Sequence, residues 1–170
     1  MDEIIEELTA DRVAWVASEF AQLGWPKPPN YFADCFAQQE AGELVFLLAR
    51  GGEALHGYLK VVWTTDYPPF REQGIPEIQD LNVMPPFRRQ GVASRLMDEA
   101  ERRIAARSAI AGIGVGLHPG YGPAQRMYVL RGYVPDARPL TYGDTFVVEG
   151  QTVKLDDELI LHLTKSLRKD

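Results

Sequence analysis

The sequence contains a single cysteine, Cys35, so no disulfide can form within the chain and no cysteine cluster can hold a metal ion. One unpaired cysteine is typical of proteins from a reducing compartment. The three histidines, His56, His118 and His162, lie far apart in the sequence and lack the short spacing of a zinc site. We therefore expect no metal cofactor.

Long apolar runs are also missing. None approaches the ~18 residues that a membrane-spanning helix needs. The first residues, MDEIIEELTADR, are acidic, whereas a secretory signal begins with positive charge and continues with an apolar run. We therefore expect a cytoplasmic protein with no membrane partner.

The sequence also has fewer positively than negatively charged residues. The sequence has 18 lysines and arginines against 24 aspartates and glutamates, which gives a net charge of −6. Nucleic-acid-binding proteins usually carry a basic face, so we expect no nucleic-acid partner. An acidic chain instead favours a small cationic substrate.

The sequence does have the length and patterning of one globular domain, residues 1–170, with 45% hydrophobic and 25% charged residues. Apolar residues at helical spacing predict helices over residues 11–23, 31–39, 91–107 and 123–131. Strands are predicted over residues 4–8, 43–50, 54–64, 75–83, 109–117, 145–153 and 158–164, with a loop at 65–73. The fold class is therefore α/β or α+β, with one mixed sheet flanked by helices.

The segment MPPFRRQGVASRL joins the predicted strand 75–83 to a helix that starts near Gly91. The first N–H groups of a helix lack partners inside the helix, and the helix dipole makes this end positive. Gly91 and Ala93 have little bulk, and Arg88 and Arg89 add positive charge. The segment predicts a phosphate cradle, although an ordinary turn with a solvated basic edge has the same composition.

Two common nucleotide motifs do not match this chain. A P-loop reads GxxxxGK[ST], and no lysine follows Gly91. A dinucleotide fingerprint reads GxGxxG; Gly112 and Gly114 begin one, but Leu117 takes the place of the last glycine. A bound phosphate would therefore belong to another class of ligand.

Two motifs together carry a family resemblance. Residues 88–93, RRQGVA, fit the pattern Gln/Arg-x-x-Gly-x-Gly/Ala after a Leu-x-Val strand and before an amphipathic helix. The later segment YGPAQRMYVLRGYVPD fits Asn-x-x-Ala-x-x-Leu-Tyr-x-x-x-Gly-Phe at Ala124, Tyr128, Gly132 and Tyr133. Residues 43–136 thus resemble the GNAT superfamily of N-acetyltransferases. The resemblance implies a single GNAT-like domain with a central, mostly antiparallel mixed sheet, a βαβ cofactor-binding unit, and acetyl-coenzyme A as co-substrate.

The resemblance also implies which residues meet the cofactor. The pyrophosphate would lie on the turn formed by Arg88, Arg89, Gln90, Gly91, Val92, Ala93 and Ser94. The pantetheine arm would pair with the backbone of Leu81, Asn82 and Val83 as an added strand does. The family's usual asparagine in the second motif is replaced by Tyr121, so Tyr121, Gln125 or a backbone group is expected to make that contact.

Attack by an amine needs a base, because an amine with a pKa near 10.4 arrives protonated at neutral pH. Glu77 and Asp80 lie on one predicted strand, and their different parity places them on opposite faces, with Glu77 on the face of Leu81 and Val83. We favour Glu77, with Asp80 or water as the alternatives. Tyr128 matches the family's general acid, and a phenol is protonated at pH 7; a tyrosine with only a core-packing role fits the same pattern.

These observations favour an N-acetyltransferase that moves an acetyl group from acetyl-coenzyme A to a primary amine of a small molecule or protein by direct attack. A non-catalytic acyl-coenzyme A sensor would carry the same cofactor motif. A third interpretation is a small α/β protein that uses an anion site for interaction; it accounts for the cationic turn but not for the second motif. Proteins of this family are often dimers, so a homodimer is compatible with the resemblance.

Overall fold

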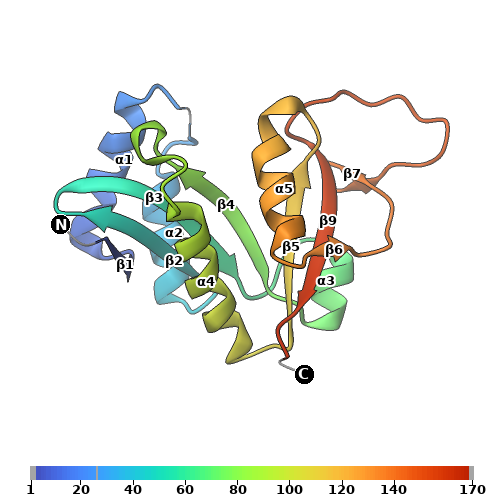
Figure 1. Ribbon diagram of the computed structural model, residues 1–170, viewed down its shortest axis with the longest axis horizontal. Helices are drawn as coiled ribbons and strands as arrows, with labels where there is room; N and C mark the ends of the chain where they lie inside the picture. Colours follow the sequence, from blue (N-terminus) through green and yellow to red (C-terminus); the bar gives the residue numbers. More distant parts are fainter. Residues whose placement is uncertain (1–2, 26, 169–170) are drawn as a thin grey trace. The chain divides into compact units, whose positions relative to one another are not determined.

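The computed structural model (Figure 1) describes residues 3–25 and 27–168. The chain divides into two compact units. The first unit contains Met1–Trp63 and Ile78–Arg103, and the second contains Thr64–Glu77 and Ile104–Asp170. Each unit has its own strands, helices and candidate site residues.

The first unit is built on four neighbouring strands in the order β1-β2-β3-β4. Their bounds are β1 Ile4–Glu7, β2 Leu44–Gly51, β3 Ala54–Val62 and β4 Glu77–Val83, of which Glu77 itself falls in the second unit. The β2–β3 pair is an antiparallel hairpin in which Leu44 lies opposite Val62 and Gly51 opposite Ala54. β1 is antiparallel to β2. The sequence predicts the bounds of these four strands to within two residues, because each is a short apolar run that ends at a turn or a charged segment.

Helices cover both faces of this part of the sheet (Figure 1). Helices α1 (Val13–Gln22) and α2 (Tyr31–Glu40) pack against Phe46, Leu48 and Tyr58. Helix α4 (Val92–Ala105) buries its apolar stripe on the other face. β3 carries a glycine, Gly57, beneath α4, where a Cβ atom would lie 2.5 Å from the backbone oxygen of Asn82 on β4.

The second unit contains β5 (Ile110–Gly116) and β9 (Leu159–Ser166), which pair antiparallel along their whole length. Short strands extend this pair: β6 Val134–Pro135, β7 Thr141–Tyr142 and β8 Thr145–Phe146. Helices α3 (Pro68–Gln73) and α5 (Gly122–Leu130) belong to the same unit. The mixed α/β class with mostly antiparallel strand pairs is thus confirmed.

Two segments differ from the sequence expectations. The predicted loop 65–73 contains α3, which starts at Pro68 because proline suits the first turn of a helix, and ends before Gly74 in the left-handed conformation (φ 63°). The predicted strand 145–153 is wrong beyond its first two residues. Thr145–Phe146 pair with β7, the Val147 amide still donates to the Leu140 carbonyl at 2.8 Å, and Gly150 at φ 82° breaks the alternation. The short strands β6 and β7 carry too few residues to give a period, so the sequence did not reveal them.

Candidate active site

In the first unit, β4 ends at Val83 and is followed by a single turn of 3-10 helix, Pro85–Phe87, and then by α4. The turn is anchored to β3, because the Met84 amide donates to the His56 carbonyl at 2.9 Å. The backbone reverses through left-handed conformations at Arg89 (φ 59°) and Gly91 (φ 84°). The predicted cradle is therefore a real strand-to-helix turn.

The side chains of this turn leave its outer surface cationic and exposed. Arg88 donates from Nε to the Val83 carbonyl at 3.1 Å, and its guanidinium lies 5.5 Å from the Trp25 ring centroid. Arg89, Gln90 and Gly91 are exposed. Because the first N–H groups of α4 and its dipole point the same way, the turn can hold an anion.

Gly91 has two reasons to be glycine. Its positive φ is one that side-chain-bearing residues rarely adopt. A Cβ atom there would also lie 2.6 Å from Nη1 of Arg95, which donates to the Gln90 carbonyl at 3.1 Å. The Arg95 Nε is held by Glu3 at 2.6 Å. A side chain at position 91 would therefore crowd the opening of the turn.

The residues Leu81, Asn82 and Val83, expected to pair with the pantetheine arm, are half-buried on β4. The structure adds a feature just before them. Asp80 has φ 56°, and a left-handed residue inside a strand is typical of a β-bulge. This interrupts the regular alternation on which the predicted faces of Glu77 and Asp80 depended.

Asp80 is the centre of a polar cluster within the first unit. Both of its carboxylate oxygens lie 2.8 Å from Nζ of Lys27. Its Oδ2 also accepts from the hydroxyls of Tyr31 and Tyr58, the latter at 2.7 Å, and its Oδ1 accepts from the Asn82 amide at 2.8 Å. The carboxylate therefore has donors on both oxygens.

This environment fixes the charge of Asp80. Burial alone would raise its pKa, but the hydrogen bonds from Lys27 and Tyr31 outweigh burial and hold the pKa below its ordinary value. Burial, together with the charge of Asp80, raises the pKa of Tyr31 and of Tyr58. The cluster is therefore an ionised carboxylate that receives hydrogen bonds from neutral phenols and from Lys27.

In the second unit, the preferred base Glu77 is buried, with 6% of its surface exposed. Its Oε2 accepts a hydrogen bond from the Thr65 hydroxyl, which also accepts from the Tyr67 amide at 3.3 Å. Position 77 is thus held in place by a loop that the sequence did not connect with it. A buried carboxylate of fixed orientation has the geometry of a general base or of a structural group.

Tyr128 lies on α5 and is buried, with 5% exposed. Burial, with a smaller effect from Tyr121, raises its pKa to about 12. The phenol therefore stays protonated at neutral pH and can donate a proton. Its ring makes an edge contact with Tyr133 at 6.1 Å between centroids.

The two residues expected to replace the family's asparagine meet at the end of β5. Gln125 donates from Nε2 to the Gly116 carbonyl at 2.8 Å. The Tyr121 ring packs on Gly116, where a Cβ atom would lie 2.3 Å from the ring, and its hydroxyl donates to Asp157 at 3.0 Å. His118 contacts the same carboxylate at 2.9 Å. Both candidates therefore surround Gly116.

Sequence reasoning missed the partners of Asp80. Lys27, Tyr31 and Tyr58 lie 53, 49 and 22 positions from it, so no local spacing joins them. The one signal in the sequence was the shared parity of Asp80 and Asn82.

No helix in the described part of the chain is long and apolar enough to cross a membrane. Nor do residues 3–25 and 27–168 group three His, Cys, Asp or Glu side chains as a metal site would.

Comparison with known proteins gives the family. The model of the acetyltransferase (GNAT) family matches residues 4–133, which is more than half of the chain. No protein of curated function matches the sequence.

Solved structures share the fold at low identity. An N-acetyltransferase from Staphylococcus aureus Mu50 superposes with a TM-score of 0.74 at 12% identity, covering 99% of this chain and 100% of its own. An acetyltransferase from Salmonella typhimurium, solved with acetyl-CoA, gives 0.64 at 18%, covering 100% and 96%. An aminoglycoside 6'-N-acetyltransferase complexed with coenzyme A gives 0.68 at 16%, covering 98% of each chain. With the match over residues 4–133, the chain belongs to the GNAT family of acetyltransferases.

Proposed function

We propose that this protein transfers an acetyl group from acetyl-coenzyme A to a primary amine. The observation that carries the proposal is the exposed cationic turn at the start of α4, with Gly91 at φ 84° and Arg88 and Arg89 beside it, in a chain of the GNAT family. We further propose that residues 1–170 act as one N-acetyltransferase domain in the cytoplasm. The acceptor is a small-molecule or peptide amine, and a homodimer stays a prediction.

The residues present suit the cofactor. The turn residues Arg88 to Ser94 supply positive charge, a helix start and a glycine without side-chain bulk for the pyrophosphate. The backbone of Leu81, Asn82 and Val83 is proposed to pair with the amides of the pantetheine arm. Gln125 and Tyr121, which surround Gly116, are proposed to border the arm.

The chemistry needs three proton transfers. The acceptor arrives as an ammonium and loses a proton to Glu77, directly or through water. The free amine attacks the thioester carbonyl, so that a C–N bond forms and the C–S bond breaks. Tyr128, whose pKa of about 12 keeps it protonated, gives its proton to the departing thiolate. The nitrogen, which carries one extra proton after the attack, gives that proton up through water, and the Tyr128 phenol is restored. Asp80 is the weaker candidate for base, because a carboxylate with a lowered pKa is a poor proton acceptor at neutral pH.

The test is calorimetric titration of acetyl-coenzyme A into the wild type and a Gly91→Glu variant. Glutamate at position 91 places a carboxylate where the pyrophosphate would lie, so we expect binding to be lost. The control is Gly42→Glu, which introduces the same residue at a similar backbone angle (φ 76°) with nothing within 4 Å. Equal binding by the wild type and Gly91→Glu would refute the cradle.

A second measurement separates catalysis from sensing. Release of free coenzyme A thiol is followed over a panel of primary amines. Turnover with at least one amine, lost in Gly91→Glu and kept in Gly42→Glu, supports the transferase. Cofactor binding without turnover across the panel would favour a sensor.

A further inference from the structure

The amino group of Lys27 fills a site built for an ammonium ion. Three aromatic rings surround it, with centroids at 4.7 Å for Tyr31, 5.6 Å for Tyr58 and 5.8 Å for Phe20. Asp80 faces it with both oxygens at 2.8 Å. Aromatic faces and a carboxylate are the groups that recognise organic cations in proteins.

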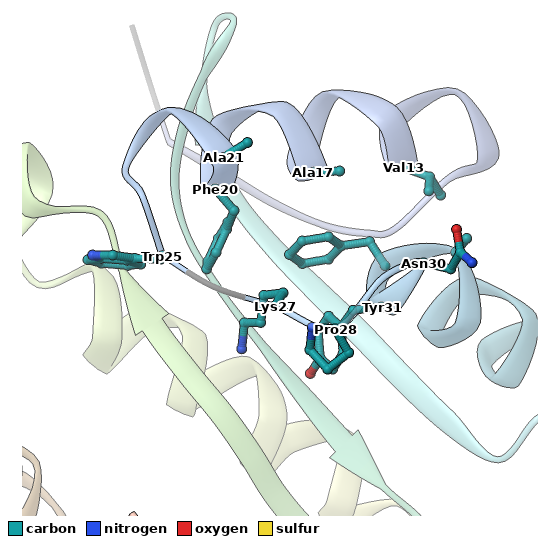
Figure 2. A pocket seen from close by; sticks show the side chains of 11 residues that line it. Val13, Ala17, Phe20, Ala21, Trp25, Lys27, Pro28, Asn30 and Tyr31 are labelled. Carbon is teal, nitrogen blue, oxygen red and sulfur yellow. The ribbon is translucent and has the colours of Figure 1, made fainter.

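The site is partly enclosed rather than a surface ion pair. The Lys27 and Asp80 side chains retain 22% and 20% of their exposure. A pocket of about 430 Å³ is formed by α1, the segment before α2, and α2 itself, and its lining includes Lys27, Phe20 and Tyr31 but not Asp80. Figure 2 shows Lys27 and Tyr31 on the side of this pocket opposite Ala17 and Ala21 of α1. The cation site therefore borders the pocket through Lys27, Phe20 and Tyr31.

Lys27 lies outside any helix or strand. Its segment joins α1 to α2 and includes Pro28 and Pro29, with left-handed residues at Gly24 and Asn30 near its ends. None of the hydrogen bonds described for Lys27 goes to another acceptor than Asp80. Its long unbranched side chain can leave the cluster by rotation about its own bonds.

The location of the site ties it to the proposed reaction. The pyrophosphate turn follows Val83, so an arm that pairs with Leu81–Val83 runs back along β4 from the turn toward Asp80. Its acyl end then comes to the side of the strand where Asp80 and Asn82 hold the cluster. This step rests on the proposed function; the ammonium site itself does not.

We propose that the Asp80 cluster binds the ammonium of the acceptor and that the acceptor is an unbranched primary alkylamine. Lys27 then competes with the acceptor for the same carboxylate, and its side chain must leave the cluster before the acceptor binds. The Lys27 side chain gives the ligand type that fits: an ammonium at the end of four unbranched methylenes, on the carboxylate and near three rings. Two of its hydrogens reach the two Asp80 oxygens, so a quaternary ammonium would forfeit both contacts. A branched carbon next to the nitrogen would meet the rings.

The first test measures binding without any chemistry. Thermal unfolding is recorded with increasing n-butylammonium chloride, against sodium chloride at equal ionic strength. In Lys27→Ala the site is empty, so n-butylammonium should give a saturable rise in Tm that tert-butylammonium does not give. Lys27→Gln, which shortens the side chain by one atom and removes its charge, should show a smaller saturable rise. In either variant, adding Asp80→Asn should abolish the effect.

The matched control is Lys60→Ala. Its ammonium lies 5.3 Å from the Tyr31 ring centroid, but its described contacts do not include Asp80. This variant loses the same charge beside the same ring without vacating the carboxylate, so it should respond to n-butylammonium as the wild type does. No saturable rise in Lys27→Ala and Lys27→Gln, or the same rise in Lys60→Ala, would overturn the ammonium site.

The second test is kinetic. If Lys27 fills the site nine-tenths of the time, its removal should lower the KM for n-butylamine about tenfold, because the apparent affinity scales with the fraction of open sites. The KM for acetyl-coenzyme A should stay unchanged. An unchanged or raised KM for n-butylamine in Lys27→Ala, with turnover intact, would overturn the competitor while leaving the transferase in place. Loss of cofactor binding in the wild type would instead overturn the proposed function.

Discussion

Replacing Asp80 by asparagine should destabilise the protein strongly, although the two side chains have nearly the same shape. The wild-type carboxylate accepts hydrogen bonds from Lys27, Tyr31, Tyr58 and Asn82. An asparagine has one acceptor oxygen in place of two, and its NH₂ group would face donors. Lys27 would keep its charge with no carboxylate opposite.

The size of the effect follows from burial. Breaking a buried ion pair by removing one partner costs about 3–5 kcal/mol. Asp80 and Lys27 retain 20% and 22% exposure, so water recovers part of that cost. We expect about 3 kcal/mol for Asp80→Asn, the low end of the range. Lys27→Met should cost about 1–2 kcal/mol, because Asp80 keeps its three other donors.

The assay is urea unfolding at pH 7 of the wild type, both single variants and the double variant. The double variant should cost less than the sum of the singles, because each single change already breaks the shared ion pair. The control is Glu53→Gln: this carboxylate is 89% exposed, with Arg12 at 3.9 Å, and should change stability by less than about 0.5 kcal/mol. A cost below about 1 kcal/mol for Asp80→Asn would refute the reasoning.

The same pair gives a pH dependence with a definite sign. The pKa of Asp80 is lower in the folded protein than its ordinary value. Its contribution to stability is therefore complete above the unfolded pKa of about 3.9, and is lost as the pH falls through the folded pKa. The gap between wild type and Asp80→Asn should be widest near neutrality and should narrow below about pH 4. A gap that widens in acid would contradict the assignment.

Two variants test the proposed proton transfers. Tyr128→Phe should lower kcat by about 10²-fold or more while acetyl-coenzyme A still binds in calorimetry, since only the proton donor is lost; unchanged turnover would remove Tyr128 from the mechanism. Glu77→Gln keeps the shape of the buried side chain and its contact with Thr65, so it should lower kcat by about 10²–10⁴-fold with folding intact, whereas wild-type turnover would return the base role to Asp80 or water.

Much of the fold follows from local sequence patterns. Helix α4 has a regular apolar period, and β2 and β3 are apolar runs separated by a Gly-Gly turn; their predicted bounds agree with the structure within a few residues. Helix α3 was missed because it is only six residues long and shows no period. The predicted strand 145–153 failed for a related reason, since its alternation has no partner strand beyond Phe146.

The candidate site divides in the same way. The cationic turn could be predicted because its chemistry lies in consecutive residues, Arg88 to Ser94, and depends on backbone groups. The Asp80 cluster could not, because it joins β4 to β3 and to the segment before α2, and only the folded chain brings them together. The left-handed backbone at Asp80 made the cluster harder to predict, because the faces of a strand can be assigned from alternation only where the strand is regular.

The contrast between the two carboxylates of β4 bears on how the reaction would be shared between them. A group that binds an ammonium must stay ionised, and the donors around Asp80 ensure that by holding its pKa low. A group that takes a proton near neutral pH must instead release that charge easily, which an aspartate held ionised by a lysine and two phenols does poorly. Glu77 is buried and accepts a hydrogen bond from the Thr65 hydroxyl, whereas Asp80 faces a lysine. The surroundings of Asp80 therefore suit it to hold a substrate's charge rather than to remove its proton, and the base role of Glu77 is the proposal that Glu77→Gln tests.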